Sequence, residues 1–296
     1  MKIKKAVLVV IVFLGSLSFG FSQKAFEILN KDDTVSQGDV LVIKMNDQLS
    51  PKRFLIYAFD RFCRANKDNM VFIGIDLAQE PGFYPIAVVD SLNNKEVNGF
   101  LFAFFGVKEK EFPHQNAPFK IRKPSKKESQ KRLEEEKVIS NAFIKEESVE
   151  LTNNWENWKK RFSMPLKKTE STGVFGTKRL YKKTIVGRHR GEDLKAKEGT
   201  PVYSIQDGSV VLARKFSLEG NMVIINHGFG TYSLYMHFSK FSVKEGQKIE
   251  AGQLIGLSGK TGRVSGPHLH FAVKINGANV DPLNFINIVH WALPLQ

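Results

Sequence analysis

Four histidines and one aspartate form three short patterns between positions 189 and 270 of the chain. They are the H-x-x-x-D of His189 and Asp193, the Tyr-Met-His that ends at His237, and the H-x-H of His268 and His270. Residues two apart on a strand point to the same face, so His268 and His270 should project together. Each pattern alone is common on protein surfaces, but their occurrence together in one glycine-rich segment indicates a shared site.

Two imidazoles and a carboxylate are a ligand set that suits a catalytic zinc ion, which typically leaves its fourth position to water. The single cysteine, Cys63, excludes an intramolecular disulfide and a cysteine-built zinc cluster, because each needs at least two thiolates. We expect Cys63 to be a small buried residue. Histidines that are not ligands could move a proton and stabilise the oxyanion of a tetrahedral intermediate.

The segment that carries these patterns is predicted to be an all-β unit of short strands and glycine turns. The expected strands are Pro201–Ser204, Gly208–Ala213, Met222–Asn226, Thr231–His237, Leu254–Leu257 and His268–Lys274. On the last of them, Leu269 and Phe271 alternate with the two histidines and should enter the core.

The N-terminal part, from Ala25 to about Ile121, is predicted to be an antiparallel β-sandwich. Its β-branched and aromatic runs are Asp39–Met45, Phe54–Phe59, Met70–Ile75, Ile86–Val89 and Phe100–Val107. The alternative is a mixed α+β domain in which Tyr57 to Asn66 is helical.

A polar stretch from Lys123 to about Leu151 contains opposite charges four residues apart, which predicts a solvated helix. Trp155, Trp158 and Phe162 follow at helical spacing, and core packing is the interpretation, with stacking on a ligand as the alternative. Residues 121–188 carry 18 basic and 9 acidic side chains. This basic segment could bind an anionic wall polymer, although a solvated linker is the default interpretation.

The N-terminus predicts export. Lys2, Lys4 and Lys5 precede the apolar run 6–19, and small residues follow, so we expect a signal peptide cleaved after Ser22. The apolar run is shorter than the roughly 20 residues that span a bilayer, and an uncleaved anchor is the alternative. The net charge of +14 favours an anionic partner. Export to the periplasm or cell envelope, or secretion, argues against nucleic acid as that partner.

From about Trp158 to Phe285 the chain resembles the lysostaphin-like, LytM-type zinc metallopeptidases, which cut peptide bonds in bacterial peptidoglycan. The shared motifs include His189-x-Gly191-x-Asp193, Glu198-Gly199-Thr200-Pro201-Val202, Asn226-His227-Gly228, Tyr235-x-His237, Gly259-x-Thr261-Gly262 and Ser265-Gly266-Pro267-His268-Leu269-His270-Phe271. The resemblance implies that His189, Asp193 and His270 ligate one Zn2+ per chain. It implies that His237 and His268 flank the metal-bound water as acid/base and oxyanion-stabilising groups.

The implied function is an exported zinc metalloendopeptidase that hydrolyses a stem or bridge peptide of peptidoglycan, with metal-bound water as the nucleophile. Either a D-Ala–diaminopimelate bond or a glycine–glycine bridge fits this class. The alternative is a non-catalytic cell-wall-binding regulator of another hydrolase, in which ligands are typically lost. His227 matches a family histidine that is not a ligand and should shape the site, whereas His114 and His290 should be surface or packing residues.

The expected fold class is mainly β. The expected domains are a signal peptide at 1–22, an Ig-like β-sandwich domain at 23–122 and a charged helical linker at 123–157, followed at 158–290 by a zinc metallopeptidase domain with an antiparallel β-sheet. The Ig-like assignment follows from the resemblance, because exported members of the family carry such a domain upstream. No stable membrane span is expected after signal removal.

Overall fold

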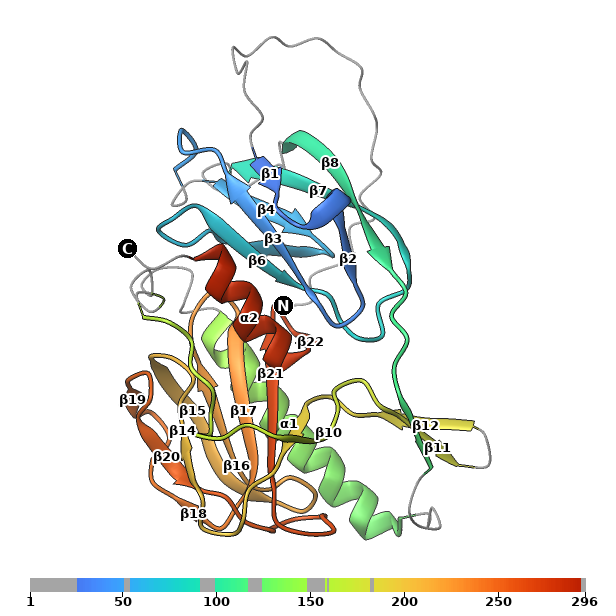
Figure 1. Cartoon of the computed structure of the whole chain (residues 1–296), viewed down its shortest axis with the longest axis vertical. Helices are drawn as coiled ribbons and strands as arrows, with labels where there is room; N and C mark the ends of the chain where they lie inside the picture. Colours follow the sequence, from blue (N-terminus) through green and yellow to red (C-terminus); the bar gives the residue numbers. More distant parts are fainter. Residues whose placement is uncertain are drawn as a thin grey trace.

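The computed structural model describes residues 26–50, 54–90, 99–116, 124–147, 158, 160–181 and 184–293 of the 296-residue chain. The expected signal peptide and Trp155 lie outside these residues. The fold is mainly β, as predicted, with a smaller β unit at the top of Figure 1 and a larger sheet below it. Within the described ranges, neither helix combines the length and the apolar character that a bilayer crossing requires.

The N-terminal unit consists of two β-sheets, ordered β1-β3-β6 and β2-β8-β7-β4-β5. The bounds are β1 Phe26–Ile28, β2 Thr34–Ser36, β3 Val40–Met45, β4 Phe54–Ala58, β5 Arg61–Cys63, β6 Met70–Gly74, β7 Gly82–Asp90 and β8 Gly99–Lys108, with the 3-10 turn η1 Lys31–Asp33 after β1. Ile43, Ile73, Ile56 and Phe105 fill one core with residues from both sheets. Cys63 is buried in the same core, as expected, and burial raises the pKa of its thiol to about 12.

The proposed helix over Tyr57 to Asn66 is wrong, because this segment contains the β4–β5 hairpin. Phe59 and Asp60 form its turn with φ of 51° and 58°. Two successive left-handed residues match the right-handed twist of the flanking strands, which is why such turns connect hairpins.

Strand β3 is buried on both faces. Leu41 and Ile43 point into the core of the N-terminal unit, whereas Val40 and Val42 belong to the core of the C-terminal unit. A strand covered on both sides needs apolar residues at consecutive positions, which explains the uninterrupted run in this part of the sequence. The two units therefore share a continuous apolar contact through β3.

The C-terminal unit contains an eight-stranded sheet with the order β10-β13-β21-β17-β16-β15-β19, in which β22 also pairs with β21. The bounds are β10 Ser171–Gly173, β13 Glu192–Leu194, β15 Gly208–Phe216, β16 Gly220–Asn226, β17 Thr231–Phe238, β19 Lys248–Ile249, β21 Leu269–Ile275 and β22 Ala278–Val280. All of these pairs are antiparallel, as predicted for this unit. Leu269 and Phe271 are fully buried, which confirms the expected alternation on β21.

Two smaller sheets flank this one. The first, β14-β20-β18, comprises Pro201–Tyr203, Leu254–Leu257 and Lys240–Phe241. The second, β12-β11-β9, comprises Thr184–Arg188, Lys178–Tyr181 and His114–Asn116. It joins the end of the N-terminal unit to the hairpin that lies between β10 and β13 in the chain.

Helix α2, Pro282–Ala292, lies between the two units (Figure 1) and was not anticipated from the sequence. Its start is strongly determined, because the Asp281 side chain accepts hydrogen bonds from the backbone N–H groups of Leu283 and Asn284 and Pro282 occupies the first turn. Phe285 and Ile286 are fully buried in the core of the C-terminal unit.

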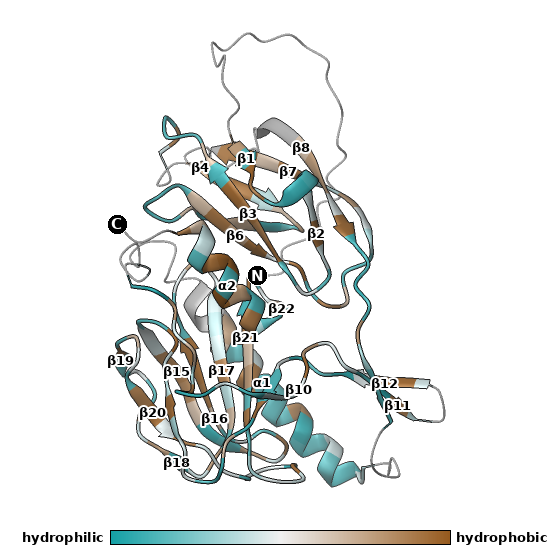
Figure 2. Cartoon of the chain, in the orientation of Figure 1, coloured by the Kyte–Doolittle hydropathy of each residue, from teal (hydrophilic) through white to brown (hydrophobic). Residues whose placement is uncertain are grey.

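Helix α1, Lys126–Glu147, forms in the region where a solvated helix is expected. Its first half is hydrophilic (Figure 2), but Val138, Ile139, Ala142 and Phe143 pack against residues of the large sheet. The interpretation of a plain solvated linker is therefore incomplete, because these apolar residues dock the helix on the C-terminal unit.

Candidate metal centre

Two strands of the large sheet bring Asp193 and His270 together. Asp193 lies on β13 and His270 lies directly opposite it on β21. His189 follows β12, and the chain returns to β13 through Gly191. A Cβ at Gly191 would lie 2.7 Å from His270 Nε2 and 2.6 Å from the Phe271 carbonyl oxygen, so only glycine fits this close approach.

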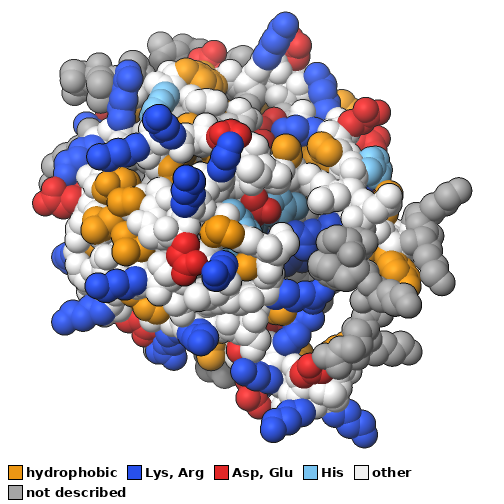
Figure 3. Space-filling view, turned by 60° about the horizontal axis from the view of Figure 1, so that its bottom comes forward, with side chains coloured by type: hydrophobic (Ala, Val, Ile, Leu, Met, Phe, Trp, Pro, Cys, Tyr) orange, Lys and Arg blue, Asp and Glu red, His pale blue; other side chains and the backbone are white. Residues whose placement is uncertain are grey.

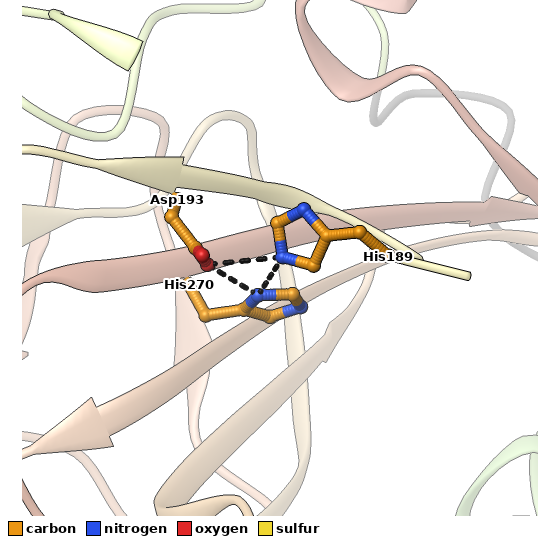
Figure 4. A group of neighbouring side chains, drawn as sticks. All are labelled: His189, Asp193 and His270. Carbon is orange, nitrogen blue, oxygen red and sulfur yellow. Dashed lines mark hydrogen bonds and ion pairs between the residues drawn. The ribbon is translucent and has the colours of Figure 1, made fainter. Parts of the chain in front are cut away.

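The three side chains converge on one point (Figure 4). Asp193 Oδ1 lies 2.8 Å from His270 Nδ1 and 3.1 Å from His189 Nε2, and the two nitrogens are 3.1 Å apart. Burial raises the pKa of the Asp193 carboxyl, but the adjacent ring nitrogens of His189 and His270 outweigh this effect and hold the pKa well below its ordinary range. The carboxylate is therefore ionised at neutral pH.

The tautomer of His189 follows from its surroundings. Its Nδ1 lies 3.0 Å from the Val174 carbonyl oxygen, which can only accept a hydrogen bond, so Nδ1 carries the proton. Nε2 then presents a lone pair toward Asp193 and His270. This arrangement, in which a carbonyl orients the ring through its other nitrogen, is typical of histidines that bind metal.

The residues fit a divalent metal ion. The ligand atoms of His189, Asp193 and His270 all lie within 4.8 Å of one another. Three electron-pair donors meet there, and burial lowers the pKa of His270, which disfavours a charged imidazolium at this position. A cation satisfies the donors, and a mixed set of two imidazoles and one carboxylate suits zinc.

His237 and His268 flank this group. The rings of His237 and His268 lie 4.9 Å apart, and His268 Nε2 is 3.6 Å from Asp193 Oδ1. His237 Nδ1 donates to the Thr261 carbonyl and His268 Nδ1 to the Gly266 carbonyl, which leaves Nε2 of each ring as the acceptor. Burial lowers the pKa of His237 to about 4, so this ring is neutral at neutral pH.

All five residues singled out from the sequence thus meet in one place. His237 adopts a φ of 67°, an uncommon conformation for a non-glycine residue. The carbonyls of Val174, Thr261 and Gly266 orient the rings, and sequence reasoning did not identify them in this role. Thr261 and Gly266 lie within recognisable motifs, whereas nothing in the sequence around Val174 indicates its contact.

Buried Glu192 supports the segment that holds His189. Its carboxylate accepts hydrogen bonds from the Phe175 backbone N–H at 2.7 Å and from the Ser171 hydroxyl. Burial raises the pKa of this carboxyl. Because Val174 precedes Phe175, Glu192 helps to fix the carbonyl that orients His189.

The remaining histidines lie elsewhere. His227 contacts Asp207 and Ser233 at the other end of β16 and β17, so it does not shape the site as expected. His290 lies away from the site, and its Nε2 is 2.6 Å from the Phe162 carbonyl oxygen. His114 is exposed on β9.

Trp158 and Phe162 are buried in the core of the C-terminal unit, 4.9 Å apart in a T-shaped contact. Packing therefore accounts for both rings. A cavity of about 760 Å³ lies beside them, between the N-terminal unit and α2, and none of the five candidate site residues lines it. The candidate site is instead a shallow hollow, where Figure 3 shows histidine side chains beside an acidic one with lysines and arginines around them.

Comparison with known proteins finds relatives of the segment that carries this group of residues. Residues 187–282 match the family model described as Peptidase family M23. The chain is 46% identical over 110 residues to peptidoglycan DD-endopeptidase ShyA of Vibrio cholerae, covering 37% of this chain and 26% of that protein. It is 43% identical over 96 residues to DD-carboxypeptidase/endopeptidase Mpg of Neisseria meningitidis, covering 32% and 22%. The chain thus spans about a quarter of the length of these curated relatives.

A solved structure extends the likeness in fold to most of the chain. A putative peptidase M23 from Pseudomonas aeruginosa superposes with a TM-score of 0.59 at 22% identity, covering 85% of this chain and 94% of that one. The candidate metal centre lies within residues 187–282, the segment that is similar to Peptidase family M23.

Proposed function

We propose that this protein is an exported zinc metalloendopeptidase that hydrolyses peptide cross-links of bacterial peptidoglycan. The observation that carries the proposal is the convergence of His189, Asp193 and His270, whose ligand atoms lie within 4.8 Å of one another. His237 and His268 stand beside these residues with Nε2 of each ring available.

In this proposal His189 Nε2, Asp193 Oδ1 and His270 Nδ1 hold one zinc ion. A bound zinc ion supplies Lewis acidity, which polarises a substrate carbonyl and lowers the pKa of water. Asp193 balances part of the ionic charge, and the Val174 carbonyl keeps His189 in the tautomer that a ligand needs.

His237 and His268 move protons in the proposed reaction. With Nδ1 bound to a backbone carbonyl, Nε2 of either ring can accept the proton of the attacking water. The resulting imidazolium can stabilise the oxyanion of the tetrahedral intermediate and then donate its proton to the leaving amine.

The substrate class rests on the curated relatives, of which one is named a peptidoglycan DD-endopeptidase and another a DD-carboxypeptidase/endopeptidase. Export agrees with this class, because the peptidoglycan lies outside the cytoplasmic membrane. A non-catalytic regulator is the rival function, and the complete set of candidate ligands argues against it.

The test pairs zinc content with the release of soluble muropeptides from purified peptidoglycan by the mature protein. We expect about one zinc ion per chain and release that a chelator stops and added zinc restores. Mass spectrometry of the products identifies the bond that is cut. Protein that binds peptidoglycan and releases nothing, with zinc bound, would favour the regulator.

The matched control for this test is His114→Ala. His114 is exposed on β9 and lies outside the candidate site. We expect this variant to retain zinc and muropeptide release, which separates the loss of a ligand from the loss of any histidine.

A further inference from the structure

A second cavity, of about 490 Å³, lies between helix α1 and the C-terminal unit. It is lined by Pro124, Glu128, Lys131, Arg132, Ser217, Leu218 and Arg263. Three of these residues are basic and one is acidic, so the cavity has a cationic lining. None of them belongs to the candidate metal centre.

The wall of this cavity is bonded directly to the candidate site. The Arg263 N–H donates to the Leu218 carbonyl at 2.9 Å, and the next carbonyl, that of Glu219, accepts from the His237 N–H at 3.0 Å. On the same side, Thr261 holds the His237 ring through its carbonyl. The consecutive residues Leu218 and Glu219 therefore connect the cavity to the proposed catalytic histidine, His237.

Helix α1 is fixed against this wall. Glu135 accepts hydrogen bonds from the Ser217 N–H at 3.1 Å and from the Ser217 hydroxyl at 2.8 Å. Its contact with Lys131 is 3.9 Å, and that of Arg132 with Glu136 is 3.7 Å, both too long for a hydrogen bond. The Lys131 ammonium and the Arg132 guanidinium thus keep donors for a ligand, on an element whose place is set by Glu135.

We propose that Lys131, Arg132 and Arg263 form a subsite for a carboxylate of the peptide substrate, so that α1 is part of the substrate-binding surface. This inference rests on the proposed function. A planar guanidinium matches a carboxylate in two parallel hydrogen bonds, and the lysine adds a point charge. The subsite sets which peptide is accepted and takes no part in the proton transfers.

The position of the subsite favours a peptide over a free wall polymer. An extended peptide advances ~3.3 Å per residue. A substrate whose scissile bond lies beside His237 therefore places a carboxylate a few residues away in the cavity. Stem peptides of peptidoglycan carry such free carboxylates, whereas a phosphodiester polymer has no need of a binding site adjacent to the histidine.

The test measures binding to the zinc-loaded mature protein by calorimetry. The probe is the tetrapeptide L-Ala-γ-D-Glu-meso-diaminopimelate-D-Ala, compared with the same peptide amidated at the diaminopimelate carboxyl. Arg132→Gln and Lys131→Gln should each weaken binding of the free peptide about fivefold, and the double variant more. The amidated peptide should bind weakly to every variant and show no further loss.

Lys137→Gln is the matched control, because Lys137 is exposed on the same helix and does not line the cavity. In peptidoglycan hydrolysis, Arg132→Gln should raise KM and leave kcat near that of the parent, the pattern of lost ground-state binding. Because the binding measurement does not depend on turnover, it reports on the subsite even if the protein hydrolyses no peptidoglycan.

Three results of the binding measurement would each overturn the inference: equal binding of the free and amidated peptides, equal losses for Lys137→Gln and Arg132→Gln, or tighter binding of a soluble phosphodiester polymer than of the tetrapeptide. The last result would assign the cations to a wall polymer. Hydrolysis with unchanged KM in all variants would remove the subsite and leave the proposed function intact.

Discussion

Histidines occupy both ends of the large sheet, and the two ends use them differently. At one end His227 is fully buried, and Nδ1 donates to the Asp207 carbonyl while Nε2 accepts from the Ser233 hydroxyl. At the other end His189 and His237 bond a backbone carbonyl through Nδ1 only. A histidine with both nitrogens bonded within the protein supports the fold, whereas one with a free lone pair beside a carboxylate is available for chemistry.

The local backbone shows the same contrast. His227 does not have a positive φ, whereas His237 adopts a left-handed conformation that costs free energy and is retained where the surroundings enforce it. The Glu219 carbonyl and the Thr261 carbonyl hold the backbone and ring of His237, respectively. At the site end of the sheet, backbone carbonyls therefore orient histidine side chains. At the other end, the contacts of His227 stabilise a buried side chain.

His270→Ala gives the largest expected effect. It removes the nitrogen that lies 2.8 Å from Asp193 Oδ1, so we expect loss of bound zinc and a fall in muropeptide release of more than about 10³-fold. Zinc content and release are measured on the same samples. Near-normal hydrolysis by this variant would contradict the ligand assignment and the contrast between the two ends.

His237→Ala and His268→Ala should separate metal binding from turnover. Neither ring is among the three converging ligands, so zinc should remain near one per chain. Loss of a general acid or base should lower kcat by about 10²–10⁴-fold. If either variant loses its zinc, that histidine is a ligand and its assignment to proton transfer fails.

His227→Gln tests the buried histidine at the other end of the sheet. Burial lowers the pKa of His227 to about 4, below its ordinary value of 6.5. Below pH 6.5, His227 binds a proton in the unfolded chain but stays neutral in the folded protein. The free energy of unfolding therefore decreases as the pH falls from 6.5 to 4. The full effect is about 3 kcal/mol.

Glutamine can keep both hydrogen bonds of His227 and cannot titrate. We therefore expect the variant to be less sensitive to acid between pH 6.5 and 4, measured as the free energy of unfolding by urea at several pH values. Its hydrolysis at neutral pH should match that of the parent. An identical pH dependence in both proteins would show that His227 is not buried in its neutral form.

The sequence was sufficient to predict which side chains come together at the site but not the contacts that support them. The alternation of His268, Leu269, His270 and Phe271 predicts which side chains share a face, because the strand period is two. The pairing of Asp193 with His270 depends on the register of β13 and β21, which lie far apart in the sequence. The occurrence of the three patterns together predicts one site, but only the resemblance to a family assigns His189, Asp193 and His270 as its ligand set.

The helices show a second limit. In α1 the opposite charges favour a fully solvated helix. The helical spacing of Val138, Ile139, Ala142 and Phe143 nevertheless indicates a face that packs against another element. In α2 the Asp-Pro start is a recognisable signal for a helix N-terminus, but it directly follows a series of strands, which are the stronger pattern in this part of the sequence. The Ig-like assignment of the N-terminal unit and the exact domain bounds stay predictions.

Phe112 gives the smallest expected effect and tests the support of the site end. A Cβ at Gly176 would lie 1.9 Å from the Phe112 ring, so the ring packs directly on that glycine. The Gly176 N–H donates to the His189 carbonyl at 2.8 Å, and the His189 N–H donates to Thr177 at 2.9 Å. Phe112 comes from the segment that joins the two units, yet it holds the turn on which His189 depends.

Phe112→Leu should therefore weaken zinc binding about tenfold, the range for residues that orient a metal ligand. Phe105→Leu is the matched control, because Phe105 is similarly buried but lies in the core of the N-terminal unit. Both variants should lose similar stability, and only Phe112→Leu should lose zinc affinity in competition with a chelator. Equal zinc affinities would mean that the turn around His189 keeps its conformation without the Phe112 ring. The site end of the sheet would then need no support from the N-terminal segment, like the end that buries His227.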